Sequence, residues 1–225
     1  MTHQYPRWAS PLGVKLTDWV AVIAFILSVG GLLWTGIARQ LYPSTDVSFP
    51  EEIQLQCTQY DGEQKRCIPD SSIVLVGDLF SIWNDSTFST KPQILKRIHA
   101  TITSDNIGKF PFFWKYFTEI VDSANKHKGN SGRAILYYGD LRNVEVEFSQ
   151  DQVADGNSIT WATLTDLIVA DDISVEFLLD FAYGDDKNAR CSLMFRQEDI
   201  SDLKNQDYPY HYIIANSVCE ELTDK

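Results

Sequence analysis

The stretch SIVLVGDLFSIW, residues 72–83, decides the fold class, because it reads as one long β-strand. Branched and aromatic side chains favour extended backbone, and Gly77 in the middle of the stretch predicts a bulge. Apolar and polar residues alternate on both sides of it, over residues 53–57 and 98–102. Such alternation is typical of strands with one buried face, and it places His99 on the solvent-facing side of its strand.

Turn signals between the other runs predict hairpins. The expected hairpins are residues 53–57 with the segment that ends at Cys67, 134–138 with 144–148, and 175–183 with 191–196. A short helix is expected over residues 198–204, and a last strand over residues 210–219. Strands at this spacing, with no long amphipathic helix, predict an antiparallel β-sandwich of either immunoglobulin-like or jelly-roll-like topology.

The N-terminal stretch WVAVIAFILSVGGLLWTGIA, residues 19–38, carries no charge and is bounded by Asp18 and Arg39. Twenty helical residues span about 30 Å, the thickness of a bilayer's hydrocarbon core. Trp19 and Trp34 stand near its ends, where indole rings favour the membrane interface. A cleaved signal peptide is the alternative, but its apolar core would be shorter. We therefore expect one transmembrane helix over residues 19–38.

This helix divides the chain into a cytoplasmic tail (1–18), the membrane segment, a linker (39–46) and an extracytoplasmic domain (47–225). Arg7 and Lys15 precede the helix, and Arg39 follows it. The excess of positive charge before the helix puts the N-terminus in the cytoplasm. The sequence thus predicts a single-pass membrane protein, with its main domain in the periplasm if the cell is bacterial.

Small residues recur along the predicted helix with a 3-4-3-4-3 spacing, at Ala21, Ala24, Ser28, Gly31, Thr35 and Ala38. Such a stripe lets a second helix approach closely, and helix association in lipid depends on close packing. The bland alternative is that small residues are common in membrane helices. The expected partners are membrane lipid and a transmembrane helix of another subunit or of a second copy.

The four cysteines, Cys57, Cys67, Cys191 and Cys219, contain no CxxC pair, which argues against a zinc site. An even number in this context indicates two disulfides in an oxidising compartment. We expect Cys57 to bond to Cys67 and Cys191 to Cys219, because each pair joins segments that read as neighbouring strands. Four reduced cysteines in a cytosolic core are the alternative.

Acidic charge is concentrated in the last third of the chain. Residues 143–225 contain 5 Lys or Arg and 18 Asp or Glu, a balance of −13 in a chain of net charge −12. This charge argues against nucleic acid as a partner. The roles left open for this acidic surface are solubility, binding of a basic partner and binding of Ca²⁺. The acidic pairs at 171–172 and 185–186 are the best metal candidates, but the strand between them places them too far apart to share one ion.

An aromatic run, FPFFWKYF at residues 110–117, is the most unusual feature of the domain. The simpler interpretation is a core strand. The functional one is a contact with a partner or a membrane, because an exposed apolar patch of this size would need cover. Its candidate residues are Phe110, Phe112, Phe113 and Trp114.

The sequence predicts no catalytic, cofactor-binding or metal-binding residues. It lacks a glycine-rich phosphate loop and the GxSxG and HExxH motifs. We therefore expect a non-enzymatic subunit of a larger membrane assembly, joined by its helix and presenting an acidic β domain. The alternatives are a ligand-binding or sensing ectodomain and a membrane-tethered hydrolase.

Overall fold

The computed structural model describes residues 16–41, 44–85, 92–120, 126–130, 133–137, 139–150, 158–205 and 210–222. The helices are α1 (Leu16–Leu41), α2 (Trp161–Ala170) and α3 (Gln197–Asn205). The strands are β1 (Thr45–Ser48), β2 (Glu52–Cys57), β3 (Tyr60–Asp61), β4 (Arg66–Cys67), β5 (Ile73–Asn84), β6 (Gln93–Ser104), β7 (Gly108–Ile120), β8 (Lys126–Asn130), β9 (Ala134–Leu136), β10 (Leu141–Ser149), β11 (Ser174–Phe181), β12 (Lys187–Met194) and β13 (Tyr212–Glu221).

Eight of the strands close into an antiparallel barrel, in the order β2–β5–β10–β7–β6–β11–β12–β13, with β13 paired back to β2. The predicted sandwich is therefore wrong. A sandwich needs two separate sheets, and here the pairing of β6 with β7 joins what would be their free edges. Alternating residues face one packed interior in both architectures, so alternation alone does not separate a barrel from a sandwich.

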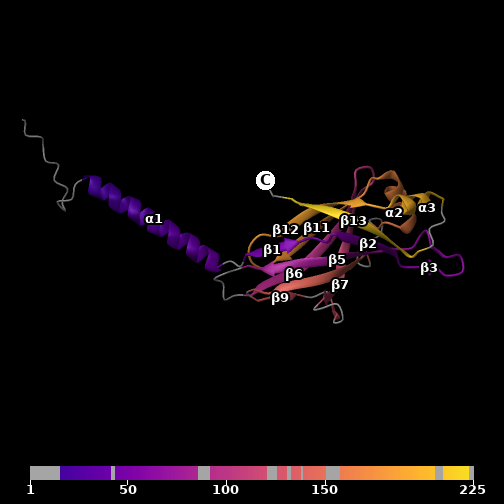
Figure 1. Cartoon of the computed structure of the whole chain (residues 1–225), viewed down its shortest axis with the longest axis horizontal. Coiled ribbons are helices and arrows are strands. Elements are labelled where there is room, and N and C mark those ends of the chain that lie inside the picture. Colours follow the sequence, from indigo (N-terminus) through magenta and orange to yellow (C-terminus); the bar gives the residue numbers. More distant parts are fainter. Residues whose placement is uncertain are drawn as a thin grey trace, which may run out of the picture.

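Strands β10 and β7 lie between β5 and β6 in the ring, so β5 and β6 are not neighbours although they follow each other in the chain. Strand β5 ends and β6 begins at the end of the barrel nearest α1, which we call the proximal end. Helix α2 crosses the opposite, distal end on its way from β10 to β11. The β3–β4 hairpin and α3 also lie at the distal end (Figure 1).

The barrel interior is filled by the inward residues of all eight strands, and Phe177 on β11 is at its centre. The Phe177 ring contacts Phe80 at 5.1 Å and Phe148 at 5.8 Å between centroids, and it stacks on Phe49 at 6.4 Å. These rings come from β5, β10 and the segment after β1. Phe177 thus connects strands that are far apart in the sequence.

A bulge is present in β5 next to the predicted position, between Gly77 and Phe80, where Leu79 has φ +60°. Val144 pairs with Phe80 and Val146 with Gly77, so β5 has one residue more than β10 across this interval. A Cβ atom on Gly77 would lie 2.6 Å from a ring carbon of Phe80. Glycine is therefore required here, because the core ring occupies the space of a side chain.

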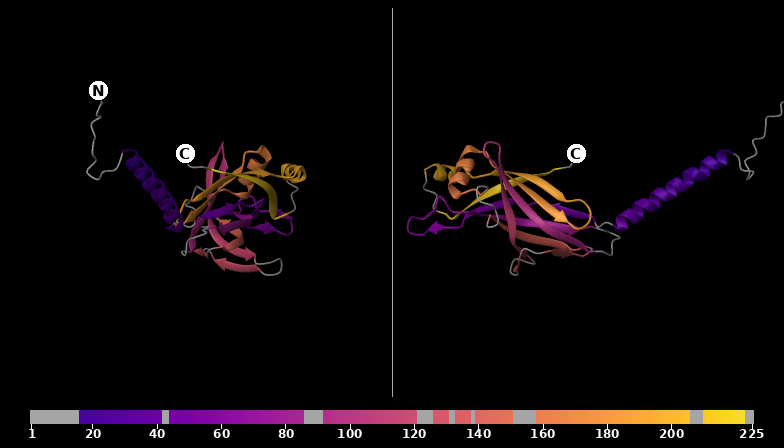
Figure 2. Two further views of the ribbon diagram at one scale, coloured as in Figure 1. Left: turned by 60° about the vertical axis from the view of Figure 1, so that its left-hand side comes forward. Right: turned by 180° about the vertical axis from the view of Figure 1, so that it is seen from behind.

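Helix α1 leaves the proximal end as a separate rod in both views of Figure 2. Within the described part of the chain, no helix is long and apolar enough to cross a membrane. The transmembrane prediction for residues 19–38 is corrected to a helix, Leu16–Leu41, that does not meet this requirement over its described residues.

Several predicted elements are confirmed, and two of the three predicted hairpins are wrong. Residues 53–57 do not pair with the segment that ends at Cys67, because β2 pairs with β5 and β13, whereas β4 pairs with β3. Strands β11 and β12 form the expected hairpin, and α3 and β13 lie where a helix and a last strand were predicted. The hairpin predicted for residues 134–148 does not form, because β9 pairs with β6, whereas β10 pairs with β5 and β7. Local turn signals did not reveal that β9 has a partner distant in sequence.

Helix α2 was not expected from the sequence. Thr160 caps its N-terminus by accepting a hydrogen bond from the Thr163 N–H, and Asp171 ends it in the left-handed conformation. Its buried side chains, Trp161, Leu164, Leu167 and Ile168, recur at helical spacing. The Thr160 cap together with this spacing was the signal that would have found it.

Both disulfides have the predicted pairing, Cys57–Cys67 and Cys191–Cys219. The first connects the end of β2 to β4. The second joins directly opposed residues of β12 and β13, next to the strand pair that completes the ring. The described residues include no free cysteine.

Replacing Phe177 with alanine should lower the free energy of unfolding by about 3–5 kcal/mol, because the cavity would lie among rings from three other segments. Leu178→Ala is the matched control. Leu178 is the next residue of β11 but is 37% exposed, so its loss should cost about 1 kcal/mol or less. Denaturant unfolding of the full chain measures both, and equal effects would contradict this account of the core.

Candidate functional site

The barrel wall opens where β6 and β7 separate, a region we call the β6–β7 seam. The two strands pair from Ser104–Gly108 to His99–Phe113 and no further. Beyond that point, Gln93 to Leu95 of β6 pair with β9, and Tyr116 to Ile120 of β7 pair with β8. Strands β8 and β9 therefore lie against the freed strand edges at the proximal half of the barrel.

Bulges in both strands explain the separation. Along β7, Trp114 and Tyr116 pair with consecutive residues of β10, which leaves Lys115 as an extra residue. Along β6, Leu95 and Arg97 pair with consecutive residues of β11, which leaves Lys96 as an extra residue. A bulge bends a strand and increases its twist, so two bulges at one level turn β6 and β7 away from each other.

The bulges also change which side chains face inward. Leu95 and Ile98 are both buried, although residues three apart point to opposite faces of a regular strand. Trp114 and Phe117 likewise share one face, with ring centroids 5.8 Å apart. The bulges thus direct additional apolar side chains into the opening between the strands.

These side chains line a cavity of about 310 Å³ inside the seam. Its buried wall is apolar and consists of Ile82, Leu95, Ile98, Leu136 and Val144. The volume is at the lower end of the range typical of small-molecule sites in proteins. The β6–β7 seam therefore contains a preformed pocket for a small ligand, which we call the seam pocket.

Strand β9, which forms one side of the pocket, is held in place by Asn84. The Asn84 side chain is fully buried at the end of β5 and donates a hydrogen bond of 2.9 Å to the carbonyl of Leu136. Its backbone accepts a hydrogen bond from the Gly139 N–H. The buried Asn84 side chain thus holds β9, and with it one side of the pocket, in place.

Trp114 supplies a polar group to this apolar wall. Its side chain is 9% exposed, and its indole N–H has no hydrogen-bond partner among the described residues. An unpaired buried donor costs about 1–3 kcal/mol, and native structures contain few of them. Trp114 therefore brings an unsatisfied donor to the wall of the pocket, and the apolar cavity itself makes the pocket a candidate binding site.

Charged side chains are found at the rim of the pocket. Arg142 donates to Glu119 at 2.7 Å and lies 3.5 Å from Asp140, so its charge is balanced within the protein. Arg133 is exposed at the mouth and makes no ion pair with any described residue. The rim therefore offers one cation to a ligand.

The aromatic run lies on β7, as the core-strand interpretation expected. Phe112 is fully buried and Trp114 nearly so, and neither can form an exposed contact surface. Phe110 and Phe113 are half-buried, and Phe113 contacts the ring of His99 at 6.2 Å. His99 lies on the outer face of β6, between the buried Ile98 and Ala100, as alternation predicted, and it is half-buried there. Burial, followed by the nearby Arg97 charge, lowers its pKa.

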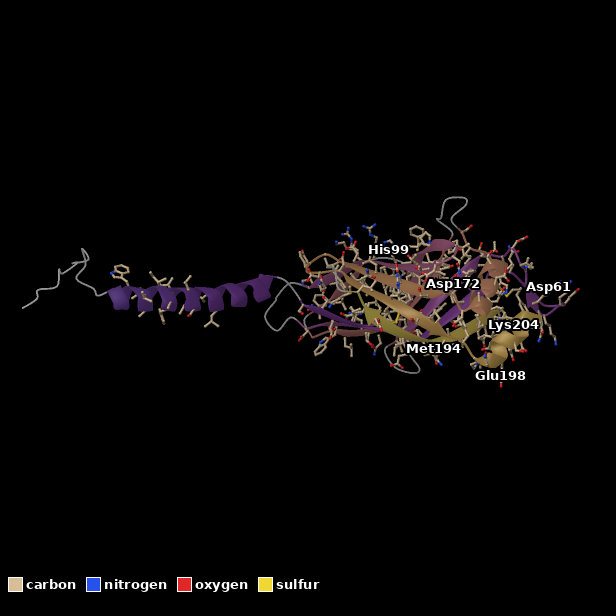
Figure 3. The ribbon with its side chains drawn as sticks, turned by 90° about the horizontal axis from the view of Figure 1, so that it is seen from above. Asp61, His99, Asp172, Met194, Glu198 and Lys204 are labelled. Atoms are coloured by element: carbon tan, nitrogen blue, oxygen red, sulfur yellow. A yellow bond between two sulfur atoms is a disulfide. The ribbon has the colours of Figure 1, made fainter. Side chains whose placement is uncertain are left out.

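The acidic pairs of the C-terminal third have structural roles. Asp172 accepts hydrogen bonds from Ser104, Asp105 and Asn106 in the β6–β7 turn, and Asp186 accepts one from the Phe181 N–H. Figure 3 places Asp172 toward the distal half, while Asp185 and Asp186 belong to the β11–β12 turn at the other end. Among the described residues, no three metal-binding side chains form a group that could hold an ion.

The small residues predicted as a helix interface, Ala21, Ala24, Ser28 and Gly31, all lie on exposed parts of α1. Ser28 donates to the Ala24 carbonyl at 2.8 Å, which satisfies its hydroxyl within the helix. The side chains of Thr35 and Ala38 lie outside the described ones. No described contact tests the stripe, and lipid or a second helix stays the predicted partner of this segment.

Comparison of the chain with models of known families, with curated proteins and with solved structures finds no match. The class of this protein is therefore defined by its own geometry. It is a closed eight-stranded antiparallel barrel with a lateral pocket and a projecting N-terminal helix. The sequence analysis did not find the pocket, because the two bulges that open it follow from strand register.

Replacing Asp172 with alanine should lower the unfolding midpoint at neutral pH, because the β6–β7 turn loses its acceptor. Hydrogen bonds from the Ser104 hydroxyl and the Asp105 N–H lower the pKa of Asp172 below its ordinary value of about 4. The stabilisation is therefore fully present above that value and is lost as the pH falls through the lowered pKa. Denaturant titrations at about pH 7 and about pH 3 should show the difference from wild type shrinking at the acidic pH.

Asp171→Gly is the matched control for this measurement. Asp171 has φ +55°, a conformation that glycine adopts without strain, so this variant should be as stable as wild type or more stable by about 0.5–1 kcal/mol. A loss at Asp171 as large as that at Asp172 would contradict the assigned roles.

Proposed function

We propose that this protein is a non-enzymatic binding protein whose barrel holds a small apolar molecule in the seam pocket. The observation that carries the proposal is the apolar cavity of about 310 Å³ with the unpaired indole N–H of Trp114 in its wall. The two disulfides support a site of action in an oxidising compartment outside the cytoplasm.

The apolar wall would provide the binding energy. Each Å² of apolar surface removed from water contributes about 25 cal/mol, and the wall residues already face one another across a formed cavity. A ligand would therefore bind without a large cost for ordering the protein. Glu119 is the acidic residue of the lining, and its ion pair with Arg142 gives it a structural part in this proposal.

Replacing Ala134 with tryptophan should weaken binding of the neutral fluorescent probe aminoanthracene by about tenfold or more. Ala134 lies on β9, lines the seam pocket and packs against the core, so a large ring there would occupy the cavity. Fluorescence titration of the full chain with the probe gives the dissociation constant.

Ser192→Trp is the matched control, because Ser192 is exposed on the outer face of β12 and does not line the seam pocket. It adds the same ring to the surface and should leave the dissociation constant unchanged. Absence of probe binding to the wild type, or equal binding by both tryptophan variants, would overturn the proposal.

A second proposed function is assembly through α1, in which an apolar helix of another subunit packs on it. The specific observation is the exposure of large side chains on this helix, which include Val20, Phe25, Ile26, Leu27 and Leu33. Exposed apolar patches of this extent mark interaction sites, and the small-residue stripe supports a helix as the partner.

Gly31→Leu tests this second function, because Gly31 lies on the stripe, and Gly30→Leu is its matched control. A Cβ atom at either position meets no atom of this chain within 4 Å, so the two changes should affect the fold alike. Only Gly31→Leu should reduce the particle size measured by light scattering on the purified full chain. A monomeric wild type, or equal loss in both variants, would contradict assembly through the stripe.

A further inference from the structure

We infer that the ligand of the seam pocket is a small amphipathic carboxylate, with its apolar body in the cavity and its negative charge at the mouth. This inference rests on the proposed binding function and adds the chemical class of the ligand. Two features of the pocket support it, the cation at its mouth and the unpaired donor in its wall.

Arg133 supplies the charge complementarity. Of the three charged residues that line the pocket, Glu119 and Arg142 form an ion pair with each other, whereas Arg133 pairs with no described residue. A guanidinium presents its N–H groups in a planar fork that matches a carboxylate. Because Arg133 is exposed, a carboxylate can reach it while part of the ligand stays in water.

Trp114 supplies the second requirement. Its buried N–H needs an acceptor, and a hydrocarbon alone would leave it unpaired. A carboxylate at the mouth carries the negative charge that Arg133 attracts, and it adds acceptor oxygens that a hydrocarbon lacks. An ammonium would meet neither requirement, because it repels Arg133 and offers no acceptor.

The charge of the surrounding chain agrees with this choice. Residues 114–142, which run from Trp114 to the ion-paired Arg142, contain five Lys or Arg and three Asp or Glu, a balance of +2. The whole chain has a net charge of −12. The register of β8 places Lys126 opposite Ile120 and Lys128 opposite Thr118, beside the seam. This segment is therefore positive in an acidic protein, which favours an anion.

Octanoate, octanol and octylammonium test the inference, because they share one apolar chain and differ in the polar group. The full chain is labelled with 5-fluorotryptophan, and the Trp114 resonance in its fluorine NMR spectrum is assigned by its loss in Trp114→Phe. We expect octanoate to shift this resonance and to bind about tenfold more tightly than octylammonium, with octanol between them.

Arg133→Glu should reverse the order, so that octylammonium binds more tightly than octanoate. Arg66→Glu is the matched control, since Arg66 is exposed on β4 at the distal end and the substitution changes the net charge equally. It should leave the order of the three ligands as in wild type.

The outcomes separate this inference from the proposed function. Equal binding of the three ligands, with the Trp114 resonance shifted by each, would overturn the carboxylate preference and leave the pocket as a binding site. Equal reversal by Arg66→Glu would also overturn it, because the preference would then reflect net charge. If neither these ligands nor aminoanthracene binds, the proposed function itself fails.

Discussion

The pairing of β6 with β7 is the constraint on which the rest of this structure depends. It closes the barrel, but it ends at His99 and Phe113 because both strands bulge just beyond that point. Buried backbone groups need hydrogen-bond partners, so the freed edge of β6 pairs with β9 and the freed edge of β7 pairs with β8. The pocket lies between β6 and β7 where these strands no longer pair with each other. The same interaction that completes the fold therefore also locates its candidate site.

The interior and the rim of the barrel have separate physical roles. Phe177 and the rings around it pack against one another in the interior, whereas the seam is bounded by side chains that bulges have turned inward. At the rim, Arg142 is shared between Glu119 and Asp140, whereas Arg133 makes no ion pair with a described residue. The acidic surface of the C-terminal third belongs to other strands, and its carboxylates support turns and ion pairs on the outer face.

Local patterns predicted what depends on neighbours in sequence. The long strand at residues 72–83, the bulge next to Gly77, the β11–β12 hairpin and both disulfides were all readable, since each involves short-range geometry or a pair of adjacent strands. Barrel closure could not be predicted, because the sequence patterns of β6 and β7 are the same whether the two strands pair with each other or not. The hairpin at residues 134–148 failed for a related reason: β9 pairs with β6, a strand distant in sequence.

The sequence by itself determined the β-rich class, the cysteine pairing, an apolar N-terminal helix and the acidity of the last third. Composition and alternation carry that information, because they depend on residue type and spacing alone. Only the tertiary structure decided that the sheet closes, that α1 does not qualify as a membrane span over its described residues, and that Trp114, Arg133 and Ala134 surround one cavity. The physical reason is register: one extra residue in β6 and one in β7 change which side chains face inward, and strand pairing, not residue type, sets where those extra residues fall.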